Sequence, residues 1–577
     1  MPVHERSSRS AIVFLLAIAG LHSAQAKDSS PVFFHTLNSD EWVAHSIKIQ
    51  KRYRRVLVVD ASGKPSKRMR VPSLQLNLRA DVNGPPHDYR VFATFQTLQD
   101  AADAAVGGDL VAVMPGHYAG FVMEDKTSAG DGRYILFKAM GEPGDVVIDQ
   151  ASRVPDWMIL LRAAHHVVIQ GFNIAGSNVP GQPPTGPRAG IMLDGEFRNT
   201  GKQVHHVVFV GNFSHNHRKW GMHSRDTHTV LIQDNLFALS AMEHSAYVSN
   251  GSDDYVIRRY VFFGSSSGGL QCNLDPLSSL EDLAKRPEFK DYPKQQPTRE
   301  WAAGLVKLAT EQFGKNNFPD GRGVNFIIED NVMNENGRVG GGSLNLAGLQ
   351  DSLIQNNLIY NNRNHGIAQW NDQNPYDEAY EEPGPDSPQQ VKGPDDLPLW
   401  GCSHNLIRNN TVLMNNPGRA AMQSRNGSWG TELRNNILIN DQPSSIEVFN
   451  TSIYRFDALF NAVNTVAYHE NDGGDAVRAM PDSMKALATH LPEGPGIITG
   501  ITQDRAAKEF VRYGNEPWVV IEGKWWRLNP NRPDFRPRGD AKLLVGWGDA
   551  SNLPQRDLAG RKRDKPSLGA FAPAEEK

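Results

Sequence analysis

The chain lacks several features that would place it in a common class of protein. Only two cysteines occur among 577 residues, so the protein is not a disulfide-stapled scaffold. The formal net charge is −4 at pH 7, which gives no indication of nucleic-acid binding. Beyond the N-terminal segment no apolar run is long enough to span a bilayer. Charged residues make up 21% and aromatic residues 8% of the chain, shares that indicate a globular protein rather than a disordered one.

The two cysteines are Cys272 and Cys402. Cys272 occupies an inward position of a short predicted strand at 269–273, and free cysteine is among the most buried residue types. We therefore expect Cys272 to be a buried free thiol, with a disulfide to Cys402 as the alternative.

Residues 1–26 have the pattern of a secretory signal. Arg6 and Arg9 precede the apolar run 11–19, and the small-residue sequence Ala-Gln-Ala at 24–26 suits a cleavage site. The apolar run is too short to span a bilayer. We expect an exported protein, secreted or periplasmic, with no membrane insertion once the signal is removed.

Short repeats dominate the middle of the chain, most clearly in 220–275. Each unit joins a short alternating strand to a second apolar strand that ends near a polar turn. Placing Asn235 in register with Gly211 and Arg259 gives equal steps of 24 residues (235−211 and 259−235), and later asparagines repeat at 26 (357−331 and 436−410). Such periods indicate a solenoid, in which each repeat buries its apolar face by stacking on the next. The asparagines suit tight corners, because Asn tolerates left-handed backbone and can hydrogen-bond to neighbouring coils.

Both ends of the repeat array carry recognisable sequence motifs. A predicted helix at 95–105 leads into a predicted strand at 109–118 that closes in Pro-Gly-His-Tyr. Near the C-terminus, Asp557, Gly560 and Arg563 form an Asp-x-x-Gly-x-x-Arg pattern, followed by Gly-Ala-Phe at 569–571. These features resemble secreted bacterial members of the right-handed parallel β-helix (pectin-lyase-like) superfamily of polysaccharide lyases, epimerases and hydrolases. The resemblance implies a polysaccharide substrate, but members differ in reaction, so it does not settle function.

The predicted fold class is all-β: a single-stranded right-handed parallel β-helix with an N-terminal cap and two loop or helical insertions. The predicted divisions are a signal peptide at 1–26, a strand-rich cap at 27–90, the β-helix at 91–450 with insertions at 275–321 and 372–402, and degraded coils with a C-terminal cap at 451–577. Both insertions leave after a short Gly-led strand, so they should emerge on the same side and form walls of a binding face. We expect a monomer.

Strand alternation predicts one polar outward face. His223, Tyr247 and Gln271 should form one row across adjacent coils, with Arg225, Ser249 and Asn273 in the row beside it. The expected catalytic residues are His223, Arg225, Tyr247 and Asp226. The expected substrate-binding residues on the same face are Asp194, His244, Gln271, Asn273, Asn345, Trp370 and Arg425.

This set of side chains suits β-elimination at a uronic acid. Arg225 would pair with the sugar carboxylate and stabilise the developing charge. His223 would remove the proton α to that carboxylate, and Tyr247 would protonate the leaving oxygen or share the base role. Mannuronan epimerases and lyases of the β-helix class resemble this in using His, Tyr and Arg or Asp groups on such a face. Their Asp-Pro-His-Asp motif is absent, and residues 223–226 (His-Ser-Arg-Asp) match it only loosely, so cleavage is preferred to epimerisation.

Two other functions fit the same fold. A glycoside hydrolase could draw an acid and a base from Asp194, Asp226, Glu243, Asp253 and Asp254. The acidic residues Asp377, Glu378, Glu381, Glu382 and Asp386 of the second insertion favour a neutral glycan, unless they hold a cation such as Ca²⁺. A non-catalytic glycan-binding solenoid would instead use exposed aromatic rings, for which Trp220, Trp370 and Trp429 are candidates. No metal site and no certain cofactor are indicated, with Ca²⁺ left open.

Overall fold

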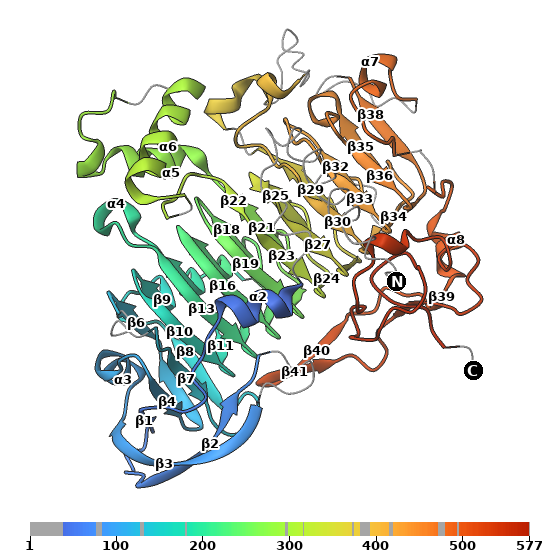
Figure 1. The fold of residues 1–577 in the computed structure, drawn as a ribbon. Helices are drawn as coiled ribbons and strands as arrows, with labels where there is room; N and C mark the ends of the chain where they lie inside the picture. Colours follow the sequence, from blue (N-terminus) through green and yellow to red (C-terminus); the bar gives the residue numbers. More distant parts are fainter. Residues whose placement is uncertain are drawn as a thin grey trace, which may run out of the picture.

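The computed structural model describes residues 38–575, apart from 77–82, 127–131, 179–181, 295–297, 316, 372–373, 381–392, 415–418, 471–478 and 493–495. The predicted signal peptide lies outside this part of the chain. The chain runs through three parallel sheets in turn and then returns to the first, so that successive turns stack as coils (Figure 1). The predicted solenoid is therefore confirmed.

The first sheet has 14 strands, of which only the β2–β3 pair is antiparallel. In spatial order they are β2 (Arg68–Leu74), β3 (Asn83–Phe95), β1 (Arg55–Val59), β4 (Asp109–Val113), β7 (Ile135–Ala139), β10 (His165–Gln170), β13 (Val204–Val210), β16 (Thr227–Gln233), β19 (Asp253–Arg258), β23 (Phe326–Glu329), β27 (Leu353–Gln355), β30 (Leu406–Arg408), β33 (Glu432–Arg434) and β36 (Asp457–Leu459).

The second and third sheets have 11 strands each. The second contains β5 (Gly116–Ala119), β8 (Val146–Gln150), β11 (Asn173–Ala175), β14 (Phe213–His215), β17 (Leu236–Ala238), β20 (Val261–Phe263), β24 (Val332–Asn334), β28 (Leu358–Tyr360), β31 (Thr411–Met414), β34 (Ile437–Asn440) and β37 (Ala462–Val463). The third contains β6 (Phe121–Glu124), β9 (Trp157–Arg162), β12 (Ala189–Asp194), β15 (Trp220–Arg225), β18 (Ala246–Ser249), β21 (Leu270–Asn273), β25 (Leu344–Ala347), β29 (Ile367–Trp370), β32 (Met422–Ser424), β35 (Ile446–Phe449) and β38 (Val466–His469).

The remaining elements are short. Three two-stranded pairs are β22 (Gly323–Val324) with β26 (Leu349–Gln350), β39 (Phe510–Arg512) with β42 (Asp534–Pro537), and β40 (Val519–Glu522) with β41 (Trp525–Leu528). The helices are α2 (Ser39–Ser46), α3 (Leu98–Ala104), α4 (Phe197–Thr200), α5 (Pro276–Ala284), α6 (Arg299–Phe313), α7 (Asp482–Lys485), α8 (Gln503–Ala507), and the 3₁₀ turns η1 (Pro287–Phe289), η2 (Pro375–Tyr380), η3 (Pro394–Asp396), η4 (Asn450–Ser452) and η5 (Ala550–Asn552). None of the described helices is long and apolar enough to cross a membrane.

The opening of the array differs from the prediction in one respect. The predicted helix is α3, capped by the Thr97 side chain, which accepts from the Asp100 N–H. The strand predicted at 109–118 is two strands, β4 and β5, which belong to different sheets. Pro115 lacks the N–H that a continuing ladder would need, and Gly116 takes φ +157°, so the chain turns a corner there.

The core fills the inside of the coils, as the alternation predicts. Met222, Val248 and Cys272 point inward from β15, β18 and β21 and belong to one buried cluster. Cys272 and Cys402 are both buried free thiols, so the prediction of an unbonded Cys272 is confirmed.

At the corners after β13, β16 and β19, the predicted register is wrong by one residue. Gln233 pairs with Val210 and with Arg258, so the two steps are 23 and 25 residues (233−210 and 258−233) rather than 24. Two adjacent residues share the two roles that were predicted for one Asn. Asp234 takes the left-handed conformation, at φ 56°, while the Asn235 side chain accepts from the Asn212 N–H and donates to the Phe209 carbonyl of the preceding coil.

A ladder of buried asparagines runs through the later coils at this corner. Asn357 Oδ1 accepts from the Asn331 N–H at 3.1 Å, and Asn357 Nδ2 donates to Asn410 Oδ1 at 2.9 Å. The predicted 26-residue step between Asn331 and Asn357 is confirmed. Each amide satisfies backbone groups that the corner would otherwise leave buried without partners.

Replacing Asn357 by Ala should destabilise the protein strongly. The change leaves the Asn331 N–H and the Ile328 carbonyl, which Asn357 also bonds, without partners in the core. We expect a loss of about 3 kcal/mol in the free energy of unfolding, measured by denaturant titration. The exposed Asn199 is the matched control, and Asn199→Ala should change stability by less than about 0.5 kcal/mol. Equal effects of the two substitutions would contradict a structural ladder.

The terminal segments cover two of the three sheets. Trp42 and Val43 of α2 join an apolar cluster on the outer face of the first sheet (Figure 1). The C-terminal segment covers the second sheet, where Phe535 and Leu568 join the outward apolar side chains. On the third sheet, the described residues form only a small outer apolar cluster of Val122, Leu160, Met192, Val154 and Trp157. The other outward side chains of the third sheet are mostly polar, and among the described residues neither terminal apolar cluster covers them.

The described parts of the two insertions pack together. α5 and α6 of the first share an apolar cluster with η2 and Trp400 of the second, and the Trp301 and Tyr376 rings stack at 6.0 Å. Phe197 of α4 joins the same cluster. This helical knob stands at the edge where the third-sheet strands end (Figure 1).

Candidate active site

The two predicted rows exist on the third sheet. His223 pairs with Tyr247, Tyr247 with Gln271, and Gln271 with Asn345. In the next row Arg225 pairs with Ser249, and Ser249 with Asn273. Because adjacent parallel strands lie about 4.8 Å apart, the rows bring the His, Tyr and Arg groups within one or two coils of each other.

The hydrogen bonds of His223 fix its tautomer. Ser249 Oγ donates its one proton to the Ser224 carbonyl at 3.0 Å, so it can only accept from His223 Nε2 at 3.2 Å. His223 Nε2 therefore carries the proton and Nδ1 holds the free lone pair. Nδ1 is shielded from solvent and has no hydrogen-bond partner among the described residues.

Aromatic rings and cations surround His223. The Trp220 ring lies 4.5 Å from the His223 ring and the Tyr247 ring 5.2 Å, edge to face. The Arg188 guanidinium lies over the Trp220 ring at 5.4 Å and has no carboxylate partner in the described chain. Burial, together with the charges of Arg225, Arg188 and Lys219, lowers the pKa of His223 to about 3, although the Asp194 charge opposes the shift. The imidazole is therefore neutral at physiological pH, in a positively charged setting.

Arg225 is held by Asp194 on the preceding coil. Its Nε donates to Asp194 Oδ1 at 2.7 Å, while Arg162 Nε donates to Asp194 Oδ2 at 3.1 Å. The Asp194 side chain is 5% exposed and that of Arg225 39% exposed. Asp194 thus serves as a buried anchor, and in the described structure the terminal nitrogens of Arg225 make no hydrogen bond. They are free to bind an anion with two parallel hydrogen bonds.

Asp226 turns into the corner behind Arg225 instead of facing outward. Asp226 is left-handed, at φ 52°, and buried. A Cβ added at Gly195 would lie 2.7 Å from the Cβ of Asp226, so only glycine leaves room there. Burial raises the pKa of Asp226 to about 7, with the Asp282 charge on α5 adding to the rise and the Arg225 charge opposing it. Asp226 is therefore half-protonated near neutral pH.

This raised pKa predicts how stability depends on pH. The folded state holds the Asp226 proton more tightly than the unfolded state does, so the carboxyl destabilises the protein as pH rises from about 4 to about 7. Asp226→Asn keeps the left-handed backbone and removes the charge. Compared with wild type, the variant should gain on the order of 3 kcal/mol at pH 8 and nothing at pH 3.5. Parallel stability–pH curves for the two proteins would overturn this account of Asp226.

Further along the third sheet the outer face is hollowed. Ala368 continues the row of His223 and Asn345, and its small side chain leaves a cavity of about 270 Å³. The remaining lining comprises Gly341, Gly342, Asn345, His365, Trp370, Arg419, Gln423 and Arg425. Three of these were predicted substrate-binding residues: Asn345, Trp370 and Arg425. The hollow lies about three strands, roughly 14 Å, from Tyr247.

Several predicted residues are engaged within the protein. His244 is buried, its Nδ1 accepts from the Gly268 N–H at 3.0 Å, and its ring supports Tyr247 at 5.7 Å. Gln271 Oε1 accepts from Asn345 Nδ2, and Gln271 Nε2 donates weakly to Asn273 at 3.5 Å. These groups shape the floor between His223 and the cavity.

The carboxylates of the hydrolase alternative do not meet on this face. Asp253 and Asp254 lie on β19 of the first sheet and accept from the Val324 N–H and Asn325. Glu243 is ion-paired with Lys219 at 3.4 Å, and Asp194 is held by its two arginines. Trp429 does not fit the glycan-binding alternative, because its ring is buried against that of His404, at 4.3 Å, away from the third sheet.

The acidic insertion can be followed only in part. Asp377 is buried and accepts from the Leu399 and Trp400 N–H groups, so it closes the insertion on itself. Glu381, Glu382 and Asp386 lie outside the described residues, as does the side chain of Glu378. The acidic residue that can be placed is therefore structural.

Sequence reasoning missed four residues that line this face: Arg188, His365, Ala368 and Arg419. Arg188 precedes β12, in a segment without the strand alternation that would have placed its side chain on this face. Ala368 was hidden because its pairing with Gln423 crosses the insertion. Aligning the short strands at 343–347, 366–370 and 421–425 would have placed it in the row of His223.

No protein-family model and no curated protein matches the chain. Among solved structures it is similar to pectate lyase Pel9A, at 13% identity over 90% of this chain and 97% of that chain, with a TM-score of 0.47. It is also similar to an alginate lyase from Paenibacillus sp. str. FPU-7, at 14% identity over 58% and 90% (TM-score 0.34), and to the A-module of Azotobacter vinelandii mannuronan C-5 epimerase AlgE6, at 12% identity over 69% and 92% (TM-score 0.29).

The chain is a right-handed parallel β-helix. The parallel order of the three sheets decides this, and the predicted fold class is confirmed. The likeness to the solved structures is one of fold. A fold does not determine a reaction, so the function depends on the residues on the outer face of the third sheet.

Proposed function

We propose that the protein is an exported polysaccharide lyase that cleaves a polyuronate by β-elimination on the outer face of the third sheet. The observation that supports the proposal is the set of cations around His223 and Tyr247 on the sheet face that the described parts of the terminal segments do not cover. Arg188, Lys219 and Arg225 surround His223 and Tyr247, and Arg419 and Arg425 line the cavity further along. A polymer with a carboxylate on each sugar suits such a surface.

The proposed reaction assigns one role to each group. The substrate carboxylate pairs with the terminal nitrogens of Arg225, which stabilise the charge that develops when the α proton leaves. His223 takes that proton, a C=C bond forms, and the glycosidic C–O bond breaks. Tyr247 gives its proton to the leaving oxygen. Because the lone pair of His223 lies on the shielded Nδ1, the imidazole must turn toward the substrate before it can act.

A product assay tests the reaction class. The purified protein would be incubated with polygalacturonate, polymannuronate, polyguluronate and a neutral glucan. The ultraviolet absorbance of unsaturated uronates and the number of reducing ends would be followed together. A lyase raises both signals on one polyuronate. A rise in reducing ends alone would show hydrolysis, and binding without either signal would show a non-catalytic module.

A further inference from the structure

Five histidines gather at the corner between the third and first sheets, on three successive coils. His165 and His166 begin β10, and His205 and His206 lie in the same place on β13. His165 pairs with His205, and His205 with His228 at the start of β16. This corner lies behind the candidate active site, and none of the five takes part in the proposed reaction.

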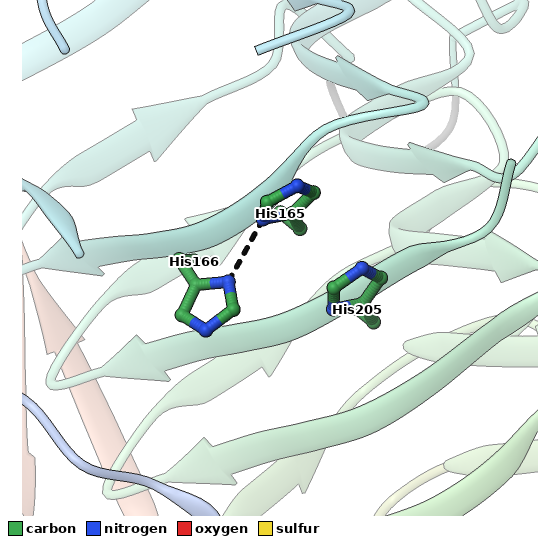
Figure 2. Close-up of side chains that lie close together, drawn as sticks. All are labelled: His165, His166 and His205. Carbon is green, nitrogen blue, oxygen red and sulfur yellow. Dashed lines mark hydrogen bonds between the residues drawn. The ribbon is translucent and has the colours of Figure 1, made fainter. Parts of the chain in front are cut away.

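The rings form two stacks that meet edge to face. His165 and His205 stack at 4.4 Å with 11° between their planes, and His166 and His206 stack at 4.5 Å with 8°. Within each coil the two Nδ1 atoms are hydrogen-bonded at 2.8 Å, and Figure 2 shows the bond between His165 and His166. His166 and His206 are left-handed, at φ 58° and 53°, which brings each ring beside that of the preceding residue.

We propose that His165, His166 and His205 bind a divalent transition-metal ion that prefers imidazole, namely Zn²⁺. One ring nitrogen from each lies within 4.8 Å of the other two (Figure 2). A tetrahedral Zn²⁺ with Zn–N bonds of about 2.0–2.1 Å separates its ligand nitrogens by roughly 3.3 Å. The nitrogens must therefore close by at most about 1.5 Å, which small rotations of the rings supply. This proposal differs from the expectation from the sequence, which indicated no metal site.

The protonation state of the cluster suits a metal. Burial, together with the other imidazoles of the cluster, lowers the pKa of His205 to about 2, so the ring is neutral. Neutral imidazole is the form that binds Zn²⁺. In the His165–His166 pair one Nδ1 already donates to the other, so the ion takes the place of that shared proton. The donor ring moves its proton to Nε2, and no proton is released.

The cluster is open to solvent on one side. A cavity of about 480 Å³ is lined by His166 and His206 together with Gln50, Thr229 and other residues, and it gives an ion a path to the rings. The charge of Lys202 reaches His165, but Lys202 is itself ion-paired with Asp125 at 2.5 Å. A bound ion would tie β10 to β13 and stiffen the corner behind Arg162 and Asp194.

Metal titration of the full chain, without a polyhistidine tag, tests the site. After treatment with a chelator, the protein would be titrated with Zn²⁺ by calorimetry, and with Co²⁺ by visible absorption as a probe of tetrahedral coordination. We expect one ion per chain and a higher melting temperature with Zn²⁺. His205→Phe keeps a stacking ring but removes a ligand. Because loss of an outer-shell partner already costs 10–100-fold, this variant should lose about 100-fold or more in affinity.

The control is His117→Gln, an exposed histidine paired with Asp149 outside the cluster, which should bind Zn²⁺ as wild type does. Equal affinity of His205→Phe and wild type would overturn the proposal. So would the absence of any Co²⁺ absorption in the wild-type protein, which would leave a stacked imidazole ladder only. The Co²⁺ result holds even if the variant fails to fold.

Discussion

Tyr247→Phe should lower kcat on the cleaved polyuronate by about 10²- to 10⁴-fold, the usual contribution of a general acid. The change removes only the hydroxyl. The ring would keep its packing against Trp220 at 5.7 Å and His223 at 5.2 Å, so the melting temperature should change little compared with the loss of kcat. Steady-state kinetics by ultraviolet absorbance, with a thermal melt of the same sample, measures both.

Tyr454→Phe is the matched control. Tyr454 is half-buried and lies under Arg455, at 5.4 Å, remote in sequence from the proposed site. Its substitution should leave kcat unchanged. If Tyr247→Phe retained wild-type kcat, the proton would come from another group and the assignment of the acid would be wrong.

Arg225→Lys should lower kcat/KM by about 10²-fold, which corresponds to roughly 2.7 kcal/mol of transition-state binding. Lysine preserves the charge and can keep the ion pair with Asp194, but it cannot offer two parallel hydrogen bonds to a carboxylate. The substitution therefore separates geometry from charge. The loss should appear on polyuronates and persist at high salt, because screening weakens a point charge more than a bidentate pair.

Arg259→Lys provides the comparison. Arg259 makes a two-point ion pair with Asp234 at the corner beyond β19, away from the third sheet. The Arg259→Lys substitution should affect stability and leave kcat/KM unchanged. An Arg225→Lys enzyme as active as wild type would mean that the substrate carboxylate binds elsewhere, with Arg419 and Arg425 as the next candidates.

The sequence predicted the coils and the outward rows because both depend on short-range rules. A strand alternates with a period of two, so the placement of His223 and Tyr247 outward followed directly from Met222 and Val248 pointing inward. The corner register was wrong by one residue because two neighbours, Asp234 and Asn235, divide the conformational and hydrogen-bonding tasks. That division is not visible in residue counting.

Long-range contacts account for what the sequence did not show. The covering of the first sheet by α2 depends on pairs such as Arg258 with Asp40, which are 218 residues apart. The hollow at Ala368 depends on strand register across an insertion. The burial of Asp226 depends on the space that Gly195 leaves. The histidine cluster could have been predicted from the sequence, since residues 165–168 and 205–208 are both His-His-Val-Val and the repeat places the two pairs on neighbouring coils.

The most direct test of the account is a crystal structure of Tyr247→Phe with an oligosaccharide of the cleaved polyuronate. We expect the sugar chain to lie across β15, β18, β21 and β25, with one carboxylate on the terminal nitrogens of Arg225 and the chain continuing toward Ala368. An oligosaccharide bound to the outer face of the first or second sheet, or one whose carboxylates avoid Arg225, would contradict the claim that the open third sheet is the active surface.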